Sequence, residues 1–192
     1  MVIYTRIKKV FLKYMQNNQS YVMPDFQPNP DWEPIDNLAK IGGSRPFITG
    51  KNNAHILQIC YFKRKKDGAL VGKLWFGPGA EGPPHHAHGG SIAGVFDEIM
   101  GAAAWLAGFP ILAARVSVDF IKPVPLGKEV KYEAWVTKVV GRRVMVDGFI
   151  LSDTNQKYAC GSGIFALIDP DKLGSMRTQL EEIVKEAGIS FL

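Results

Sequence analysis

Cysteine is scarce in this sequence of 192 residues, which contains only Cys60 and Cys160. Both lie in apolar stretches typical of strands, and two cysteines are too few for a disulfide framework. We therefore interpret them as buried, reduced thiols rather than as a disulfide or a catalytic nucleophile.

Long apolar runs and long basic runs are absent as well. The longest uncharged stretch, Ile99 to Ala114, is interrupted by glycine and proline and is shorter than the ~20 apolar residues that span a bilayer. No run of lysine and arginine is interleaved with aromatic residues, as it would be in a nucleic-acid-binding surface. The net charge of +5 fits an anionic ligand, but equally any soluble basic protein. The sequence therefore predicts no integral membrane segment and no nucleic-acid partner.

The length and the hydrophobic share of 46% suit one domain with an ordinary core rather than two. We divide the chain into an N-terminal extension over residues 1–50, a main domain over residues 51–170 and a C-terminal helix over residues 171–192. This last helix is expected to pack on the domain through one apolar side.

The N-terminal extension has no acidic residue before Asp25. Residues 1–20 mix basic and apolar side chains, which fits a helix covering the domain, an amphipathic helix on a membrane surface or a presequence-like segment. Four prolines in residues 24–34 exclude a regular helix and favour an extended connector, which Trp32 is expected to pin down. We expect a cytoplasmic protein, with targeting to an organelle through the basic segment as the alternative.

Six strand-like stretches surround one helical stretch. The pair Asp67-Gly68 predicts a hairpin between the first two strands, and Gly108 and Pro110 are expected to end the helix. Two strands, a long helix and four more strands do not fit an alternating parallel sheet, and they favour an antiparallel sheet wrapped around a buried helix. The expected strands cover residues 55–63, 69–76, 112–122, 129–140, 143–152 and 157–168.

The rest of the chain is organised around the stretch from His85 to Trp105. If a helix begins near Gly90, the amides there have no acceptor within the helix and point outward beside the positive end of the helix dipole. Residues three and four apart share a helix face. One face here holds a single carboxylate, Asp97, among very small residues, which are Gly90, Gly94, Gly101 and Ala104. Each glycine costs about 1 kcal/mol of helix stability relative to alanine, so we expect something to pack or bind against this face.

The residues His88-Gly89-Gly90, followed after six residues by Asp97, resemble the HGG-x6-D signature of hotdog-fold acyl-CoA thioesterases of the PaaI-like type. The stretch Val118 to Gly127 resembles the strand and turn after that family's central helix, and the resemblance covers about residues 55 to 168. It implies an α+β hotdog fold, in which an antiparallel sheet wraps around a long central helix, here with N-terminal and C-terminal helical extensions. It also implies a homodimer or a dimer of dimers that hydrolyses an acyl-CoA of fatty acid metabolism to the free acid and CoA.

By this resemblance, Asp97 acts as general base or nucleophile, the backbone N–H of Gly90 donates to the oxyanion, and His88 orients the turn or the attacking water. In similar enzymes the carboxylate and the glycine amide come from opposite subunits. The residues implied in substrate binding are Gly89, Asp119, Lys122, Arg142 and Arg143. A solvated basic hairpin is the alternative interpretation of the two arginines.

Other roles stay open. Glu98 is a second candidate for the catalytic acid, although it lies about 100° round the helix from Asp97. The spacing of His85, His86 and His88 allows a metal site, but they lie in a proline-flanked loop with no cysteine or carboxylate close by in sequence, so we expect no metal. No cofactor is expected either, because CoA is part of the substrate.

Three rival functions remain. Ala113 stands near the place where some similar thioesterases carry a hydroxyl that holds the water, which favours a non-catalytic acyl-CoA-binding hotdog protein as the first rival. A hydratase or dehydratase of the same fold would need a catalytic histidine on the helix, where Asp97 stands instead. A metal-dependent hydrolase would use the three histidines.

Overall fold

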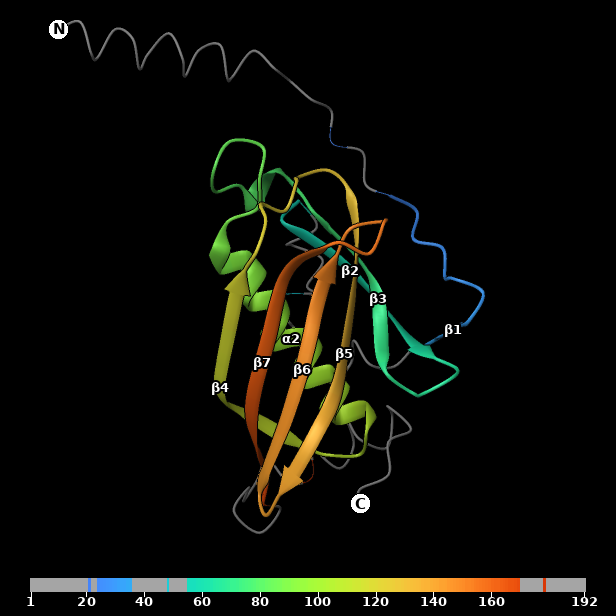
Figure 1. Cartoon of the computed structure of the whole chain (residues 1–192), viewed down its shortest axis with the longest axis vertical. Coiled ribbons are helices and arrows are strands. Elements are labelled where there is room, and N and C mark those ends of the chain that lie inside the picture. Colours follow the sequence, from blue (N-terminus) through green and yellow to red (C-terminus); the bar gives the residue numbers. More distant parts are fainter. Residues whose placement is uncertain (1–20, 22–23, 36–47, 49–54, 170–177, 179–192) are drawn as a thin grey trace, which may run out of the picture.

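The computed structural model describes residue 21, residues 24–35, residue 48, residues 55–169 and residue 178. Within this part of the chain, seven strands form one antiparallel sheet that curves around helix α2 (Figure 1). The strands follow one another across the sheet in the order β1-β2-β3-β5-β6-β7-β4. The elements are β1 (Trp32–Pro34), β2 (Leu57–Arg64), β3 (Leu70–Phe76), the 3-10 helix η3 (Pro78–Ala80), α2 (Gly89–Leu106), β4 (Ile111–Phe120), β5 (Glu129–Val140), β6 (Arg143–Leu151) and β7 (Lys157–Leu167).

The antiparallel sheet around a central helix is the architecture that the sequence predicts, and it is confirmed. The strand expected over residues 129–140 begins and ends at those residues, and the other expected strands differ by one or two residues at their ends. At the expected hairpin, the amide of Gly68 donates to the carbonyl of Arg64 over 2.8 Å. The φ of Gly68 is 73°, a left-handed conformation that glycine adopts without a steric penalty.

Helix α2 has a defined start and a defined end. At the start, Nδ1 of His88 accepts a hydrogen bond of 2.9 Å from the backbone amide of Gly90. At the end, Gly108 has a φ of 85°, and the amide of Phe109 donates to the carbonyl of Ala104 over 2.9 Å. This is a Schellman motif, which satisfies the last carbonyls of the helix. The helix therefore ends where Gly108 is expected to end it.

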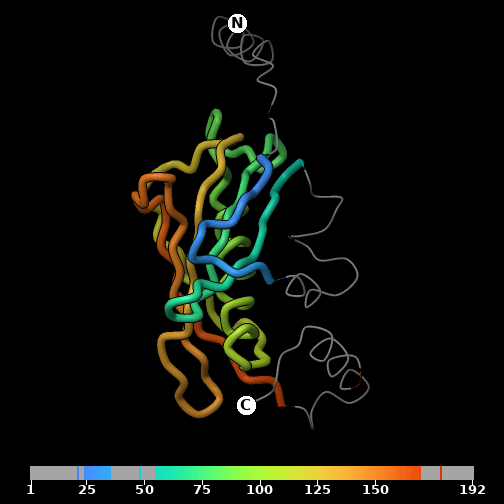
Figure 2. The backbone as a smooth tube through the Cα atoms, turned by 90° about the vertical axis from the view of Figure 1, so that its right-hand side faces the viewer, coloured from blue at the N-terminus to red at the C-terminus, as the bar shows by residue number. Residues whose placement is uncertain are grey.

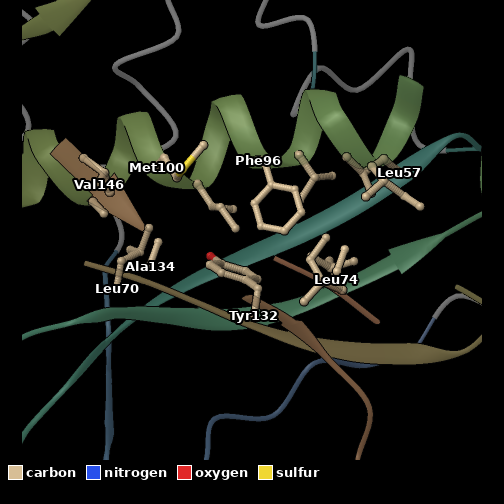
Figure 3. Close-up of a cluster of buried hydrophobic side chains, with 14 of the residues drawn as sticks. Leu57, Leu70, Leu74, Phe96, Met100, Tyr132, Ala134 and Val146 are labelled. Carbon is tan, nitrogen blue, oxygen red and sulfur yellow. The ribbon is translucent and has the colours of Figure 1, made fainter. Parts of the chain in front are cut away.

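The core lies between α2 and the face of the sheet that it covers (Figure 3). In the close-up the Phe96 ring points from the helix toward the strands that carry Leu74 and Tyr132, and all three side chains are fully buried. Gly161 of β7 leaves the room for the Phe96 ring, because a Cβ at that position would overlap the ring. The large side chains of α2 thus determine how closely the sheet wraps around it.

The proline-rich residues 24–35 run beside the sheet as an extended segment (Figure 2). Three of them form β1, which pairs with β2, and the ring of Trp32 packs on Phe62 with 5.6 Å between the centroids. The sequence predicts an extended connector here but not a strand. The helices expected within residues 1–20 and 171–192 lie outside the described residues. No helix in the described part of the chain is both long and apolar enough to cross a bilayer.

Strand β4 forms the opposite edge of the sheet and pairs only with β7 among the described strands. Apolar side chains near both of its ends are poorly covered: the exposed fraction is 64% for Leu112, 57% for Phe120 and 50% for the following Ile121. A register shift between Ala113 and Arg115 marks a bulge in this strand. An uncovered strand edge bordered by apolar side chains is suited to pairing with another strand.

Candidate active site

The loop that leads into α2 is held by the turn after β4. The amide of Ala87 donates to the carbonyl of Val124 over 2.9 Å, and the amide of Leu126 donates to the carbonyl of His85 over 3.0 Å. These bonds join the loop to the Pro-Val-Pro-Leu-Gly turn, which the sequence analysis links to the same family pattern. Backbone hydrogen bonds to the turn after β4 therefore hold the loop that precedes the helix in place.

Gly90 and His88 meet at the first turn of α2. The hydrogen bond from the Gly90 amide to Nδ1 of His88 means that the predicted oxyanion donor already has an acceptor within its own chain. Because Nδ1 accepts here, the imidazole is neutral with its proton on Nε2. The sequence does not predict this cap, since histidine is not among the residues preferred at a helix start.

Asp97 lies on the helix face that carries Gly90, Gly94 and Gly101, as predicted from the spacing. Its side chain is exposed, and no group within the described residues forms a hydrogen bond with its carboxylate. The neighbouring protein removes part of the water around it, and this desolvation raises the pKa of Asp97 above the ordinary value of an aspartate. A carboxylate that has a raised pKa and no hydrogen-bond partner among the described residues is available to accept a proton.

Glu98, the adjacent acid, has a different environment. Its Oε1 accepts a hydrogen bond of 2.6 Å from the hydroxyl of Tyr61 in β2, and the Tyr61 ring in turn packs edge-on against Tyr132. Burial raises the pKa of Glu98, and the hydrogen bond from Tyr61 partly opposes this effect. The second candidate acid is therefore engaged in holding the helix to the sheet.

A pocket of about 320 Å³ opens beside the first turn of α2. It brings the predicted residues His88 and Gly90 together with residues from the preceding loop and from the start of β2. Asp97 of the same chain does not line it. The lining residues are Ile48, Ile56, Leu57, Gly79, Ala80, Glu81, His88, Gly90 and Ser91.

Three of the predicted substrate-binding residues, Gly89, Asp119 and Lys122, lie in different surroundings. Gly89 lies next to the ring of Phe120, since a Cβ on Gly89 would be 3.5 Å from it. Asp119 pairs with Cys160 in the register of β4 and β7, which puts it on the face of the sheet away from α2. Lys122 is exposed and donates to Oε1 of Gln156 over 3.0 Å. Only Gly89 of these three is brought to the start of the helix.

The two arginines of the β5–β6 hairpin also differ from each other. Arg142 donates to the carbonyl of Leu167 over 3.0 Å and forms a 3.4 Å ion pair with Asp169, so it ties the hairpin to the end of β7. Arg143 is exposed. The hairpin lies at the end of the sheet opposite to the start of α2 (Figure 1). A contact between Arg143 and CoA stays a prediction.

The three histidines do not converge. The backbone of His85 is left-handed with a φ of 62°, Nδ1 of His86 lies 2.8 Å from the carbonyl of Pro84, and His88 caps the helix. Among the residues that the structure describes, no group of three or more histidine, cysteine, aspartate or glutamate side chains is placed to hold a metal ion.

A curved antiparallel sheet wrapped around one long helix is the hotdog fold, and two solved structures have the same architecture. Protein RHA08564, described as a thioesterase superfamily protein, superposes with a TM-score of 0.56 at 19% identity, over 85% of this chain and 76% of that chain. The PaaI protein of E. coli, from the phenylacetic acid degradation operon, superposes with a TM-score of 0.52 at 18% identity, over 59% of this chain and 80% of that chain.

Sequence comparison points in the same direction. Residues 85–159 match the family model of the thioesterase superfamily, and this segment includes His88, Gly90 and Asp97. Acyl-coenzyme A thioesterase THEM4 of Xenopus laevis is 32% identical over 114 residues, which make up 59% of this chain and 51% of that protein. The chain spans about half the length of the curated relatives it matches. The resemblance to hotdog-fold thioesterases that the sequence indicates is thereby confirmed.

Proposed function

We propose that this protein is an acyl-CoA thioesterase, with Asp97 as general base or nucleophile. The observation that carries the proposal is the Asp97 carboxylate itself, which has no partner in the described part of the chain and a pKa raised by desolvation. The relatives named acyl-coenzyme A thioesterases support the substrate class. Since a thiolate is a good leaving group, the reaction needs a base or nucleophile and an oxyanion donor more than it needs a strong general acid.

The Gly90 N–H supplies the oxyanion donor in this proposal. It lies at the start of α2 and borders the pocket, where a thioester carbonyl oxygen replaces Nδ1 of His88 as its acceptor. One preorganised donor of this kind typically contributes about 3–4 kcal/mol to transition-state stabilisation. CoA enters as part of the substrate, and no resident cofactor is needed.

The site becomes complete in a homodimer. Asp97 follows Gly90 by seven residues, which separates them by about 10 Å along the helix axis, whereas reacting atoms must approach to about 3–3.5 Å. The Gly90 amide of one chain and the Asp97 carboxylate of its partner meet this requirement when two helices pack side by side. The uncovered edge of β4, with Leu112 and Phe120 exposed, supports pairing with a second copy.

Replacing Asp97 by asparagine tests the catalytic role. We expect Asp97→Asn to lower kcat/KM for thiol release from acyl-CoA by about 100- to 10,000-fold, because the amide cannot accept the proton. Glu98→Gln is the matched control, and it should retain most of the activity. Release of CoA is followed with a thiol-reactive dye, and folding is checked by circular dichroism.

Unchanged turnover of Asp97→Asn would remove Asp97 from the mechanism. A wild-type protein that binds acyl-CoA without releasing thiol would instead support the binding protein that Ala113 favours. Ala113 pairs with Phe165, so it lies on the face of β4 turned toward α2. A hydroxyl is therefore missing from the side on which the reaction is proposed.

Mixing two inactive variants tests whether the site spans two chains. Gly90→Pro removes the N–H donor, and Gly90→Ala, which keeps it, is the control. When Asp97→Asn and Gly90→Pro chains are unfolded together and refolded, each mixed dimer has one intact pair of Gly90 and Asp97 from opposite chains. We expect activity to return in the mixture. No recovery, with mixed dimers demonstrated by mass spectrometry, would contradict the shared site.

A further inference from the structure

The lining of the pocket beside the first turn of α2 is of two chemically different kinds. Its polar part comes from Glu81 and from the start of the helix, at His88, Gly90 and Ser91. Its apolar part consists of the aliphatic side chains of Ile48, Ile56, Leu57 and Ala80. The pocket's volume of about 320 Å³ is near the lower limit of ligand pockets, which run from roughly 300 to 1,000 Å³.

Backbone hydrogen bonds hold the part of the apolar lining that contains Ile56 and Ala80. The amide of Gly77 donates to the carbonyl of Ile56 over 2.9 Å, and the amide of Gly79 donates to the carbonyl of His55 over 3.0 Å. Gly79 is needed for this approach, because a Cβ there would lie 2.8 Å from Cγ1 of Ile56 and 2.6 Å from Cδ2 of His55. The 3-10 helix η3 is therefore fixed against the residues that lead into β2, and this wall of the pocket is held by backbone hydrogen bonds.

We infer that this pocket holds the acyl group of the substrate, and that it selects an apolar chain of about ten carbons or fewer. This inference rests on the proposed function, in which the Gly90 amide binds the thioester carbonyl at the start of the helix. An acyl chain attached to that carbonyl extends toward Ile56 and Leu57, which offer it no hydrogen-bonding group. A water molecule, which is similar in size to a methylene group, takes about 30 Å³, so the pocket has room for about ten such groups.

The dependence of the rate on chain length tests the inference. With wild-type protein and a series of straight-chain acyl-CoAs, kcat/KM should rise by up to about fourfold for each added methylene and level off or fall beyond about ten carbons. Ile56→Ala, which widens the pocket, should move the optimum to longer chains. Ile56→Phe, which fills it, should move the optimum to shorter chains. Damage to the fold does not produce shifts in opposite directions.

The matched controls are Ile59→Ala and Ile59→Phe. Ile59 is a partly buried isoleucine of β2 that packs against the core and does not line the pocket. Its variants should lower the rate for all chains alike. A flat length profile in wild-type protein, or equal profiles for the Ile56 and Ile59 variants, would overturn the assignment of the pocket.

A binding measurement separates this inference from the proposed function. In Asp97→Asn, which leaves the acyl-CoA intact, the Kd for the same series should follow the same chain-length dependence. If no wild-type hydrolysis is seen at any length while Kd still follows chain length and shifts with Ile56, the thioesterase proposal is wrong and the acyl pocket stands. If hydrolysis occurs and Kd ignores both chain length and Ile56, the acyl pocket is wrong and the thioesterase proposal stands.

Discussion

The two faces of helix α2 are built from opposite kinds of residue. One face carries Ile92, Phe96 and Ile99, all of which are at most 4% exposed and fill the space under the sheet. The other carries glycines and alanines around Asp97, and large side chains are absent from it. The comparison indicates that side-chain volume on one face fixes the fold, whereas the lack of volume on the other leaves the backbone accessible to a ligand or a second chain.

The two adjacent carboxylates follow the same division. Glu98 is turned toward β2, where the Tyr61 hydroxyl donates to it, and Asp97 is turned toward the small-residue face without a partner among the described residues. A rotation of about 100° around the helix thus separates a structural acid from a proposed catalytic one. The following changes test this division.

The largest expected effect comes from the buried face. Phe96→Ala should lower the free energy of unfolding by about 3–5 kcal/mol, because the ring is fully buried and the glycine opposite it has no side chain to fill the void. Urea denaturation followed by circular dichroism measures the loss. Val140→Ala, at a valine that is 48% exposed, is the control and should change stability by no more than about 0.5 kcal/mol. Equal losses for the two variants would mean that this face does not fix the fold.

A smaller effect is expected at the bond between the helix and β2. Tyr61→Phe removes the donor to a partly buried carboxylate and should cost about 1–3 kcal/mol of stability while thiol release is largely retained. Tyr132→Phe is the matched control, since it removes only a 3.0 Å bond to the carbonyl of Cys60 and should cost about 1 kcal/mol. If Tyr61→Phe abolishes hydrolysis at unchanged stability, the roles assigned to Glu98 and Asp97 must be exchanged.

The smallest effect is expected on the small-residue face. Within the described residues, a Cβ at Gly101 would have only Cδ1 of Ile111 near it, at 4.0 Å, so Gly101→Ala fits this part of the single chain. Better helix propensity should then raise the stability of the single chain by about 0.5–1 kcal/mol. In the proposed dimer the added methyl lies on the surface facing the partner and should weaken association, as measured by analytical ultracentrifugation. A stabilised chain with unchanged association would exclude this face from the dimer interface.

Much of the fold could be predicted because its helix and strands show a local periodicity of apolar residues. The alternation in β4 and β6 and the helical spacing from Ile92 to Ile99 each depend on neighbours a few residues away, and these elements agree with the structure. The strand β1 could not be predicted in this way. It has three residues, ends at a proline and depends on a contact between Trp32 and Phe62 across the sheet edge.

The candidate site could be predicted in position but not in its hydrogen bonds. Spacing alone put Asp97 and Gly90 on one helix face. The partners that distinguish Glu98 and Arg142 come from Tyr61 and Leu167, which are distant in sequence and adjacent only after folding. The cap formed by His88 depends on a side-chain rotamer that the motif His-Gly-Gly does not specify.

The hydrogen bond between Gly90 and His88 has a consequence for how such a site divides its binding energy. In the proposed reaction the Gly90 amide is already hydrogen-bonded before the substrate arrives. The thioester oxygen replaces a neutral imidazole nitrogen as its acceptor, so the free energy of substrate binding changes little. In the transition state negative charge develops on that oxygen. The hydrogen bond from the Gly90 amide then becomes stronger than its bond to the imidazole, because the acceptor is charged. The helix start then contributes little to the capture of the substrate and mainly speeds its conversion.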